Sequence, residues 1–276
     1  MHRFLFDVVA SARGVLPPFT GHLVRAAFLS MVQKHSPSLA HRLHEAAQIR
    51  PYATTPLRSK KGQPFARDQK TGAIFIHENN LAKFSINSLT TPLGREIIDI
   101  VLKDLADTEF ELSQTPFRVI RVSVESLDPS SLLKPPQRVA KFRLDFRTPT
   151  YFSAVGTTAI CRFPDPVRIF GNLASLWNEC IAPELGDLKL PETDFINWVY
   201  QAVVVTGYRL WTRTTKLAQT IPLIGFEGFT HFAVVNPSNH FAPWIHPLLM
   251  LGTFSNIGQG RTAGFGVTYY SPHHEF

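Results

Sequence analysis

The sequence predicts an α+β protein made of two tandem βαββαβ units. Each half of the chain shows roughly two helix patterns interleaved with four or so strand patterns. This order suits ferredoxin-like (RRM-like) units better than a doubly wound parallel sheet. A stretch rich in proline and serine, Leu127 to Pro136, falls almost at the midpoint and is the best linker by composition. We therefore expect one domain over residues 1–127 and a second over residues 137–276.

In the first half, hydrophobic periodicity predicts an opening strand over residues 4–9, largely buried on both faces, and a helix over residues 22–34. Ser36 before Pro37 resembles an N-cap followed by a first-turn proline, so a second short helix should start there. Periodicity and turn residues predict the other elements of this half. They are strands over residues 52–57, 72–77, 81–89 and 117–124 and a helix over residues 94–106.

In the second half, Arg138 to Phe146 alternates cleanly between apolar and charged residues and predicts a strand. Asp165 before Pro166 is again an N-cap followed by proline, and predicts a helix that runs to Ile181. The remaining elements are predicted in the order strand, strand, helix, glycine-rich loop and strand. Their ranges are 203–216, 226–235, 244–254, 255–266 and 267–270.

The composition indicates a folded protein with a polyanionic partner. Of the 276 residues, 44% are hydrophobic, enough for a sizeable core. The net charge of +7 favours a partner such as nucleic acid, although it also serves solubility. Cys161 and Cys180 make neither a disulfide framework nor a zinc cluster, so a reducing cytoplasm fits best. We expect no signal peptide and no membrane span, because no apolar run is long enough.

The glycine-rich loop has four glycines within nine residues, with Arg261 and Thr262 between them. Glycine permits positive φ and close backbone approach, so such a loop can turn its N–H groups toward a phosphate chain. A dinucleotide fingerprint should follow a strand and open a helix, whereas this loop follows a helix. The loop also lacks the Gly-Lys-Ser/Thr of a P-loop. The alternative interpretation is a long glycine turn that leads into a strand.

The order of helix, Gly-x-Gly-basic-x-x-Gly-aromatic-Gly and final strand resembles the C-terminal signature of the RAMP superfamily. Within it, the chain resembles the CRISPR-associated endoribonucleases that cut precursor repeat RNA. Residues 225–229, 144–152, 21–28 and 36–45 agree with the same family. The resemblance implies the duplicated ferredoxin-like fold, although the halves share no obvious repeat. It also implies metal-independent cleavage of each repeat by 2′-hydroxyl attack, which leaves a cyclic phosphate or 3′-phosphate and a 5′-hydroxyl and releases guide RNAs.

The resemblance implies that His44 is catalytic, because Leu43-His44-Glu45 matches a Leu-His-Glu sequence that the family often places in this short helix. Such a ribonuclease needs a base for the 2′-hydroxyl and an acid for the departing 5′-oxygen. Histidine, with an ordinary pKa of about 6.5, serves either purpose near neutrality. His41, on the same face, is the alternative catalytic residue. A histidine that merely packs is the structural alternative.

Two further catalytic candidates lie beyond that helix. Members of the family often carry a basic residue near the position of Arg50, whose guanidinium would stabilise charge on the pentacoordinate phosphorus. A solvated arginine at a helix end is the alternative. Some members pair the histidine with a tyrosine of the first helix, where this chain has Phe28-Leu29. Tyr52 is the nearest phenol in sequence.

RNA binding is expected from three stretches, each of which combines cations with glycine or aromatic residues. The glycine loop contributes Gly258, Gly260, Arg261, Thr262, Gly264 and Gly266. A basic loop contributes Arg58, Lys60, Lys61 and Arg67. A strand places Arg209, Trp211 and Arg213 on one face, which would otherwise pack on a partner domain.

We expect no metal and no cofactor, because no set of acidic, histidine or cysteine residues completes a site around His41 and His44. The expected partner is CRISPR repeat RNA, together with other subunits of an effector complex where one exists, and the chain is expected to be a monomer or homodimer. A rival hypothesis is a non-catalytic RAMP subunit that binds guide RNA. A third is a tandem RNA-binding module unrelated to CRISPR.

Overall fold

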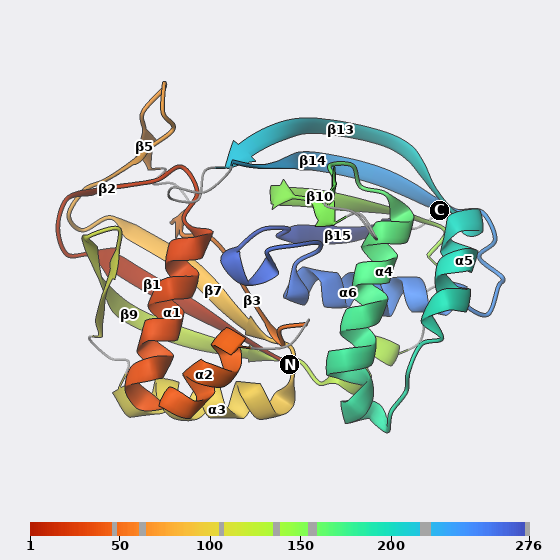
Figure 1. The fold of residues 1–276 in the computed structure, drawn as a ribbon, viewed down its shortest axis with the longest axis horizontal. Coiled ribbons are helices and arrows are strands. Elements are labelled where there is room, and N and C mark those ends of the chain that lie inside the picture. Colours follow the sequence, from red (N-terminus) through yellow and green to blue (C-terminus); the bar gives the residue numbers. More distant parts are fainter. Residues whose placement is uncertain are drawn as a thin grey trace. The chain divides into compact units, whose positions relative to one another are not determined.

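The computed structural model describes residues 1–45, 49–60, 65–104, 108–134, 139–153, 159–215 and 222–273. These residues form two compact units, whose helices and strands are labelled in Figure 1. The N-terminal unit consists of Met1–Ser126 together with Thr262–Gly264. The C-terminal unit consists of Leu127–Arg261 and Phe265–Phe276.

The main sheet of the N-terminal unit has the strand order β3-β7-β1-β9-β8, with β4 also paired to β7. Its strands are β1 (His2–Ala10), β3 (Tyr52–Thr54), β4 (Arg58–Ser59), β7 (Leu81–Ser88), β8 (Glu109–Leu112) and β9 (Thr115–Ser126). The helices are α1 (Gly21–His35), α2 (Pro37–Glu45) and α3 (Thr91–Asp104). A small sheet joins β2 (Gly14–Leu16), β6 (Ile74–Ile76) and β5 (Ala66–Arg67).

The core of this unit lies between one face of the main sheet and the helices. Phe4, Phe6 and Val8 are buried on the helix side of β1, whereas the alternate residues are only partly buried. The expectation of a strand buried on both faces was therefore too strong. Val24 and Phe28 of α1 belong to the same hydrophobic core.

The C-terminal unit has a four-stranded antiparallel sheet with the order β13-β14-β10-β15. Its strands are β10 (Lys141–Thr150), β13 (Val203–Thr215), β14 (Leu223–Val234) and β15 (Thr268–His273). A hairpin joins β11 (Phe152–Ser153) and β12 (Ile160–Cys161). The helices are α4 (Pro166–Leu176), which continues into a π-helical turn (Trp177–Ile181), α5 (Glu192–Ala202) and α6 (Ile245–Ser255).

Both main sheets follow one plan. The strands β3, β7, β1 and β9 are neighbours in that order in the N-terminal sheet, as are β13, β14, β10 and β15 in the C-terminal sheet. Counted in chain order, both rows run second, third, first, fourth, which is the arrangement of a βαββαβ ferredoxin-like unit. The predicted fold class is confirmed. Helices α4 and α6 lie on the same side of the C-terminal sheet (Figure 1).

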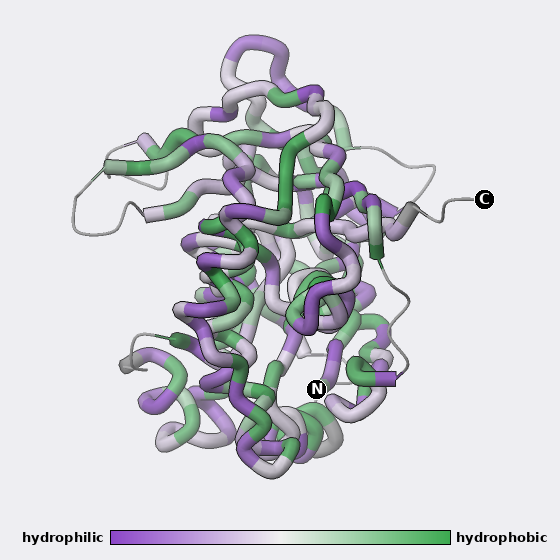
Figure 2. The backbone as a smooth tube through the Cα atoms, turned by 90° about the vertical axis from the view of Figure 1, so that its right-hand side faces the viewer, coloured by the Kyte–Doolittle hydropathy of each residue, from purple (hydrophilic) through white to green (hydrophobic). Residues whose placement is uncertain are grey.

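Alternation along the strands decides which face of the C-terminal sheet is buried. Phe142, Leu144 and Phe146 of β10 are buried on the helix side, where Phe142 meets Phe170 of α4 edge-on. The residues between them are charged and face the other way. Figure 2 colours the backbone by hydropathy and shows hydrophobic and hydrophilic residues interspersed along the chain. We call the face opposite the helices the outer sheet face.

Helix α5 was not predicted, although its signal is present in the sequence. Phe195, Trp198, Val199 and Ala202 are buried at helical spacing, and acidic residues occupy the first turn. None of the helices in the described part of the chain is long and apolar enough to span a membrane.

Candidate functional site

Helix α2 presents His44 to solvent. The helix starts where the sequence predicts, with Ser36 Oγ accepting from Leu39 N–H at 3.4 Å. Leu39 and Leu43 are buried in the core of the N-terminal unit. Because the helix is amphipathic, His41 and His44 both lie on its exposed side. A side chain in this position is accessible to a large ligand such as RNA.

Two arginine contacts hold this helix in place. Arg42 Nη2 donates to both carboxylate oxygens of Glu96 in α3, at 2.7 and 2.6 Å. Arg50 Nη2 donates to the main-chain carbonyl of His44 at 3.4 Å, where the end of a helix leaves carbonyl groups without partners. The structure therefore brings Arg50 to the backbone of His44.

Tyr52 has a different environment. Its side chain is fully buried on β3, and its ring lies 5.8 Å from that of Phe28, between centroids. The phenol oxygen is buried without a hydrogen-bond partner in the described part of the chain. The structure does not support the prediction that Tyr52 takes part in proton transfer, because solvent and RNA do not reach it in this conformation.

Much of the glycine loop is folded against the rest of the C-terminal unit. Gly258, Gly260, Gly264 and Gly266 all have positive φ, between 69° and 91°. A Cβ on Gly266 would lie 1.8 Å from the carbonyl oxygen of Ile257. Several main-chain N–H groups of the loop already donate to the protein. They are those of Ile257, Gly258, Gln259, Phe265 and Gly266, whose acceptors are Gly266, Asn172, Tyr151, Gly260 and Pro149.

Arg261 is buried, with 9% of its surface exposed. Its Nη1 donates to the carbonyl of Ser255 in the last turn of α6 at 3.1 Å, and Asn256 Nδ2 donates to the Arg261 carbonyl at 3.1 Å. Thr262 is also buried, and within the N-terminal unit its carbonyl accepts from Thr54 Oγ1 at 2.9 Å. A contact between these two side chains and RNA stays a prediction, since both already serve the fold.

The basic loop is only partly described. Arg58 is partly buried on β4, and Lys60 is exposed. Arg67 on β5 is exposed, and its Nη1 donates to the carbonyls of Pro18 and Gly72 at 3.3 and 3.4 Å. Lys61 lies outside the described residues.

Strand β13 places Arg209, Trp211 and Arg213 on the outer sheet face, as the alternation predicts. All three are exposed. The carboxylate of Glu227 on β14 accepts from Trp211 Nε1 at 3.1 Å and from Arg213 Nε at 3.2 Å. This carboxylate fixes the indole and the neighbouring guanidinium relative to the sheet.

Other reactive groups offer weaker candidates. No group of three His, Cys, Asp or Glu side chains in the described residues is arranged to hold a metal. Burial raises the pKa of the Cys180 thiol to about 11, so this thiol is a poor nucleophile.

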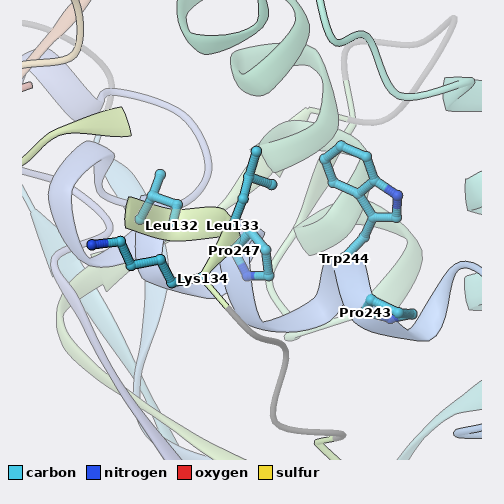
Figure 3. A pocket seen from close by; sticks show the side chains of 6 residues that line it. All are labelled: Leu132, Leu133, Lys134, Pro243, Trp244 and Pro247. Carbon is cyan, nitrogen blue, oxygen red and sulfur yellow. The ribbon is translucent and has the colours of Figure 1, made fainter. Parts of the chain in front are cut away.

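A small pocket is lined by Leu132, Leu133, Lys134, Pro243, Trp244 and Pro247 (Figure 3). It is mainly apolar and contains no acid–base pair.

Two family models match the chain on either side of the predicted linker. Residues 144–268 match the model described as CRISPR-associated endoribonuclease Cas6, and residues 3–127 match the Cas6 N-terminal domain. The chain belongs to the Cas6 family. The resemblance to RAMP endoribonucleases is thereby confirmed.

Solved Cas6 structures have the same fold. The chain is 20% identical to a Cas6 product complex, with a TM-score of 0.76 over 98% of this chain and 99% of that chain. It is 19% identical to Thermus thermophilus Cas6, with a TM-score of 0.69 over 98% of each chain. A Cas6-related protein from Pyrococcus furiosus is 13% identical over 98% of each chain, with a TM-score of 0.60. Among curated protein sequences, none matches this Cas6 chain.

Sequence reasoning missed two features, one on each unit. The ion pair between Arg42 and Glu96 joins residues far apart in the chain, and periodicity does not predict such a pair. Phe229 and Tyr269 join the face of Trp211 through strand pairing. Their alternation was visible in the sequence, but the strand order that unites them was not.

Proposed function

We propose that this Cas6 protein cuts CRISPR repeat RNA in the precursor transcript by metal-independent attack of a 2′-hydroxyl on the neighbouring phosphate. The observation that carries the proposal is the exposed His44 on a short helix whose other face is buried. Membership of an endoribonuclease family supplies the reaction class. The side chain of His44 is free to approach RNA while its backbone is held.

The reaction requires two proton transfers. A base removes the proton of the 2′-hydroxyl, the 2′-oxygen forms a bond to phosphorus, and the bond to the 5′-oxygen of the next nucleotide breaks. An acid then delivers a proton to that leaving oxygen. The products are a 2′,3′-cyclic phosphate and a 5′-hydroxyl, and hydrolysis of the ring gives a 3′-phosphate. We assign one of the two transfers to His44, because imidazole exchanges protons near neutral pH.

Arg50 is proposed to act in two ways. Its contact with the His44 carbonyl stabilises the end of α2, and a guanidinium suits the oxygens of a phosphate. A proton-transfer role for Tyr52 would require its buried side chain to leave the core. The second proton transfer is therefore not assigned to Tyr52.

Several solved relatives support the RNA part of the proposal. They include a Cas6 product complex, a Cas6 substrate-mimic complex and a RAMP protein that binds different RNA substrates. A histidine-to-alanine variant of one Cas6 protein has also been solved. By the same reasoning we propose that exposed cations such as Lys60, Arg67 and Arg209 bind the phosphates of the repeat.

Cleavage in excess EDTA tests this mechanism. Labelled repeat RNA should be cut once per repeat without added metal, and end analysis should find a 5′-hydroxyl on the downstream product. A repeat with a 2′-deoxy nucleotide at the scissile position should resist cleavage, because the nucleophile is missing. Strict dependence on a divalent metal, or a 5′-phosphate on the product, would contradict the proposed chemistry. Tight binding of the repeat without any cleavage would favour the non-catalytic RAMP subunit.

A further inference from the structure

The outer sheet face of the C-terminal unit carries one row of side chains across all four strands. Pairing places Arg209 of β13 beside Phe229 of β14, Phe229 beside Asp145 of β10, and Asp145 beside Tyr269 of β15. Trp211 lies two residues further along β13 on the same face. The four strands lie side by side in Figure 1.

Two aromatic rings on this face are available to a ligand. Trp211 is 43% exposed and Tyr269 is 48% exposed, whereas most large aromatic side chains of the unit are buried. The hydrogen bond to Glu227 orients the Trp211 indole. The ring of Phe229, between them, is covered by the Arg143 guanidinium at 4.0 Å, so Phe229 supports the face.

The face is also cationic. Its cations, Lys141, Arg143, Arg147, Arg209 and Arg213, outnumber its two carboxylates, Asp145 and Glu227. Both carboxylates are already engaged by arginines of the same face. The Arg147 guanidinium lies 5.5 Å from the centre of the Tyr269 ring and is 56% exposed. Each exposed ring therefore has an exposed arginine beside it.

We propose that the outer sheet face binds a single-stranded segment of RNA. Its bases stack on Trp211 and Tyr269, and its phosphates pair with Arg147, Arg209 and Arg213. Exposed aromatic rings interleaved with arginines on a four-stranded sheet suit unstacked bases, which a duplex does not offer. The excess of cations on this face favours a polyanionic ligand over a protein partner.

This inference deepens the proposed function, on which it rests for the choice of RNA over other polyanions. It names single-stranded RNA as the ligand of a surface that does not contain His44. Cleavage and binding by this face are therefore separable. The repeat RNA would be held through an unpaired segment as well as at the scissile bond.

The test measures the affinity of a fluorescein-labelled eight-nucleotide oligouridine by anisotropy. Trp211→Ala and Tyr269→Ala should each weaken binding by about 5- to 100-fold, the usual effect of removing one stacking ring. Trp211→Phe should retain most of the affinity. Tyr200→Ala is the matched control, because Tyr200 is a 78% exposed aromatic residue on α5, and it should bind like the wild type. Melting temperatures confirm that each variant is folded.

Two further arms decide between ligands. Arg213→Ala should lower the slope of log affinity against log salt by about 0.7, the effect of one single-strand phosphate contact. A blunt hairpin RNA should bind the wild type and Trp211→Ala equally. Wild-type oligouridine binding by Trp211→Ala and Tyr269→Ala would overturn the proposal. An equal loss of hairpin binding would also overturn it, because the face would then contact duplex.

The two proposals fail in different ways. If the wild-type protein never cuts repeat RNA but oligouridine binding depends on Trp211, the proposed cleavage is wrong and the single-strand surface stands. If repeat RNA is cut while both ring variants bind oligouridine normally, the cleavage stands and the surface is wrong.

Discussion

Arg50 and Arg261 make the same kind of contact in very different surroundings. Each donates from its guanidinium to a main-chain carbonyl in the last turn of a helix, that of His44 in α2 or that of Ser255 in α6. Such carbonyls lack helical partners and attract a cation. Arg50 is partly exposed, whereas Arg261 is buried inside the glycine loop.

The two arginine contacts therefore differ in role: one lies beside the candidate catalytic residue, and the other stabilises the fold. At α2 the arginine contacts the backbone of an exposed histidine, so the side chain of His44 is accessible to a ligand. At α6 the arginine, the positive-φ glycines and the inward N–H groups fill the loop with internal contacts. The most family-specific motif of the chain therefore stabilises the fold. The shorter and less specific Leu-His-Glu sequence carries the candidate reaction.

The largest expected effect concerns Gly266. Gly266→Ala should lower the free energy of unfolding by at least about 4 kcal/mol, because its Cβ would meet the Ile257 carbonyl oxygen at 1.8 Å. Gly186→Ala is the matched control, with nearly the same φ, +68° against +69°, and no atom within 4 Å. It should cost only about 1–2 kcal/mol for the left-handed backbone. Urea unfolding compares the two, and equal losses would mean that the loop tolerates a side chain.

Arg261 gives the next largest effect. Arg261→Ala should lower the free energy of unfolding by about 2–3 kcal/mol, because it leaves the buried Ser255 carbonyl without this donor. Arg50→Ala should cost less than about 1 kcal/mol, since its contact is longer and partly exposed. Denaturant titrations measure both. If Arg261→Ala were as stable as the wild type but bound RNA more weakly, Arg261 would contact phosphate as the sequence predicts.

The smallest expected effect concerns the ion pair that ties α2 to α3. Glu96→Gln should lower stability by no more than about 1 kcal/mol, because the pair is largely exposed. It should nevertheless slow cleavage a few-fold at unchanged RNA affinity, since α2 would be held less firmly. Asp7→Asn breaks a comparably exposed pair, Arg121 with Asp7, and serves as the control. Equal cleavage rates for both variants in single-turnover assays would show that this pair does not position His44.

Local signals in the sequence predicted much of the fold. Asp165 caps α4 as expected, with its side chain accepting from Arg168 N–H at 3.0 Å. The clean alternation of β10 correctly separated its buried and charged faces. Alternation was informative here because one side of the strand faces a core and the other does not.

The site was harder to predict, because burial depends on contacts between distant residues. An arginine among glycines resembles a phosphate ligand, and only the left-handed turns of the loop bring Arg261 back to Ser255. Tyr52 is the nearest phenol in sequence, but its side chain on β3 is buried in the core beside Phe28. The exposure of His44 follows from the amphipathic pattern of α2, so that part of the site could be predicted.

The most direct test of the catalytic assignment is single-turnover cleavage of repeat RNA by His44→Ala, with His41→Ala from the same exposed helix side as the control. His44→Ala should lower the rate by about 10²–10⁴, the usual contribution of a general acid or base. RNA affinity and melting temperature should stay near the wild-type values, because a proton-transfer group acts mainly in the transition state. A wild-type rate for His44→Ala with a slow His41→Ala would move the role to His41, and wild-type rates for both would contradict an active site on α2.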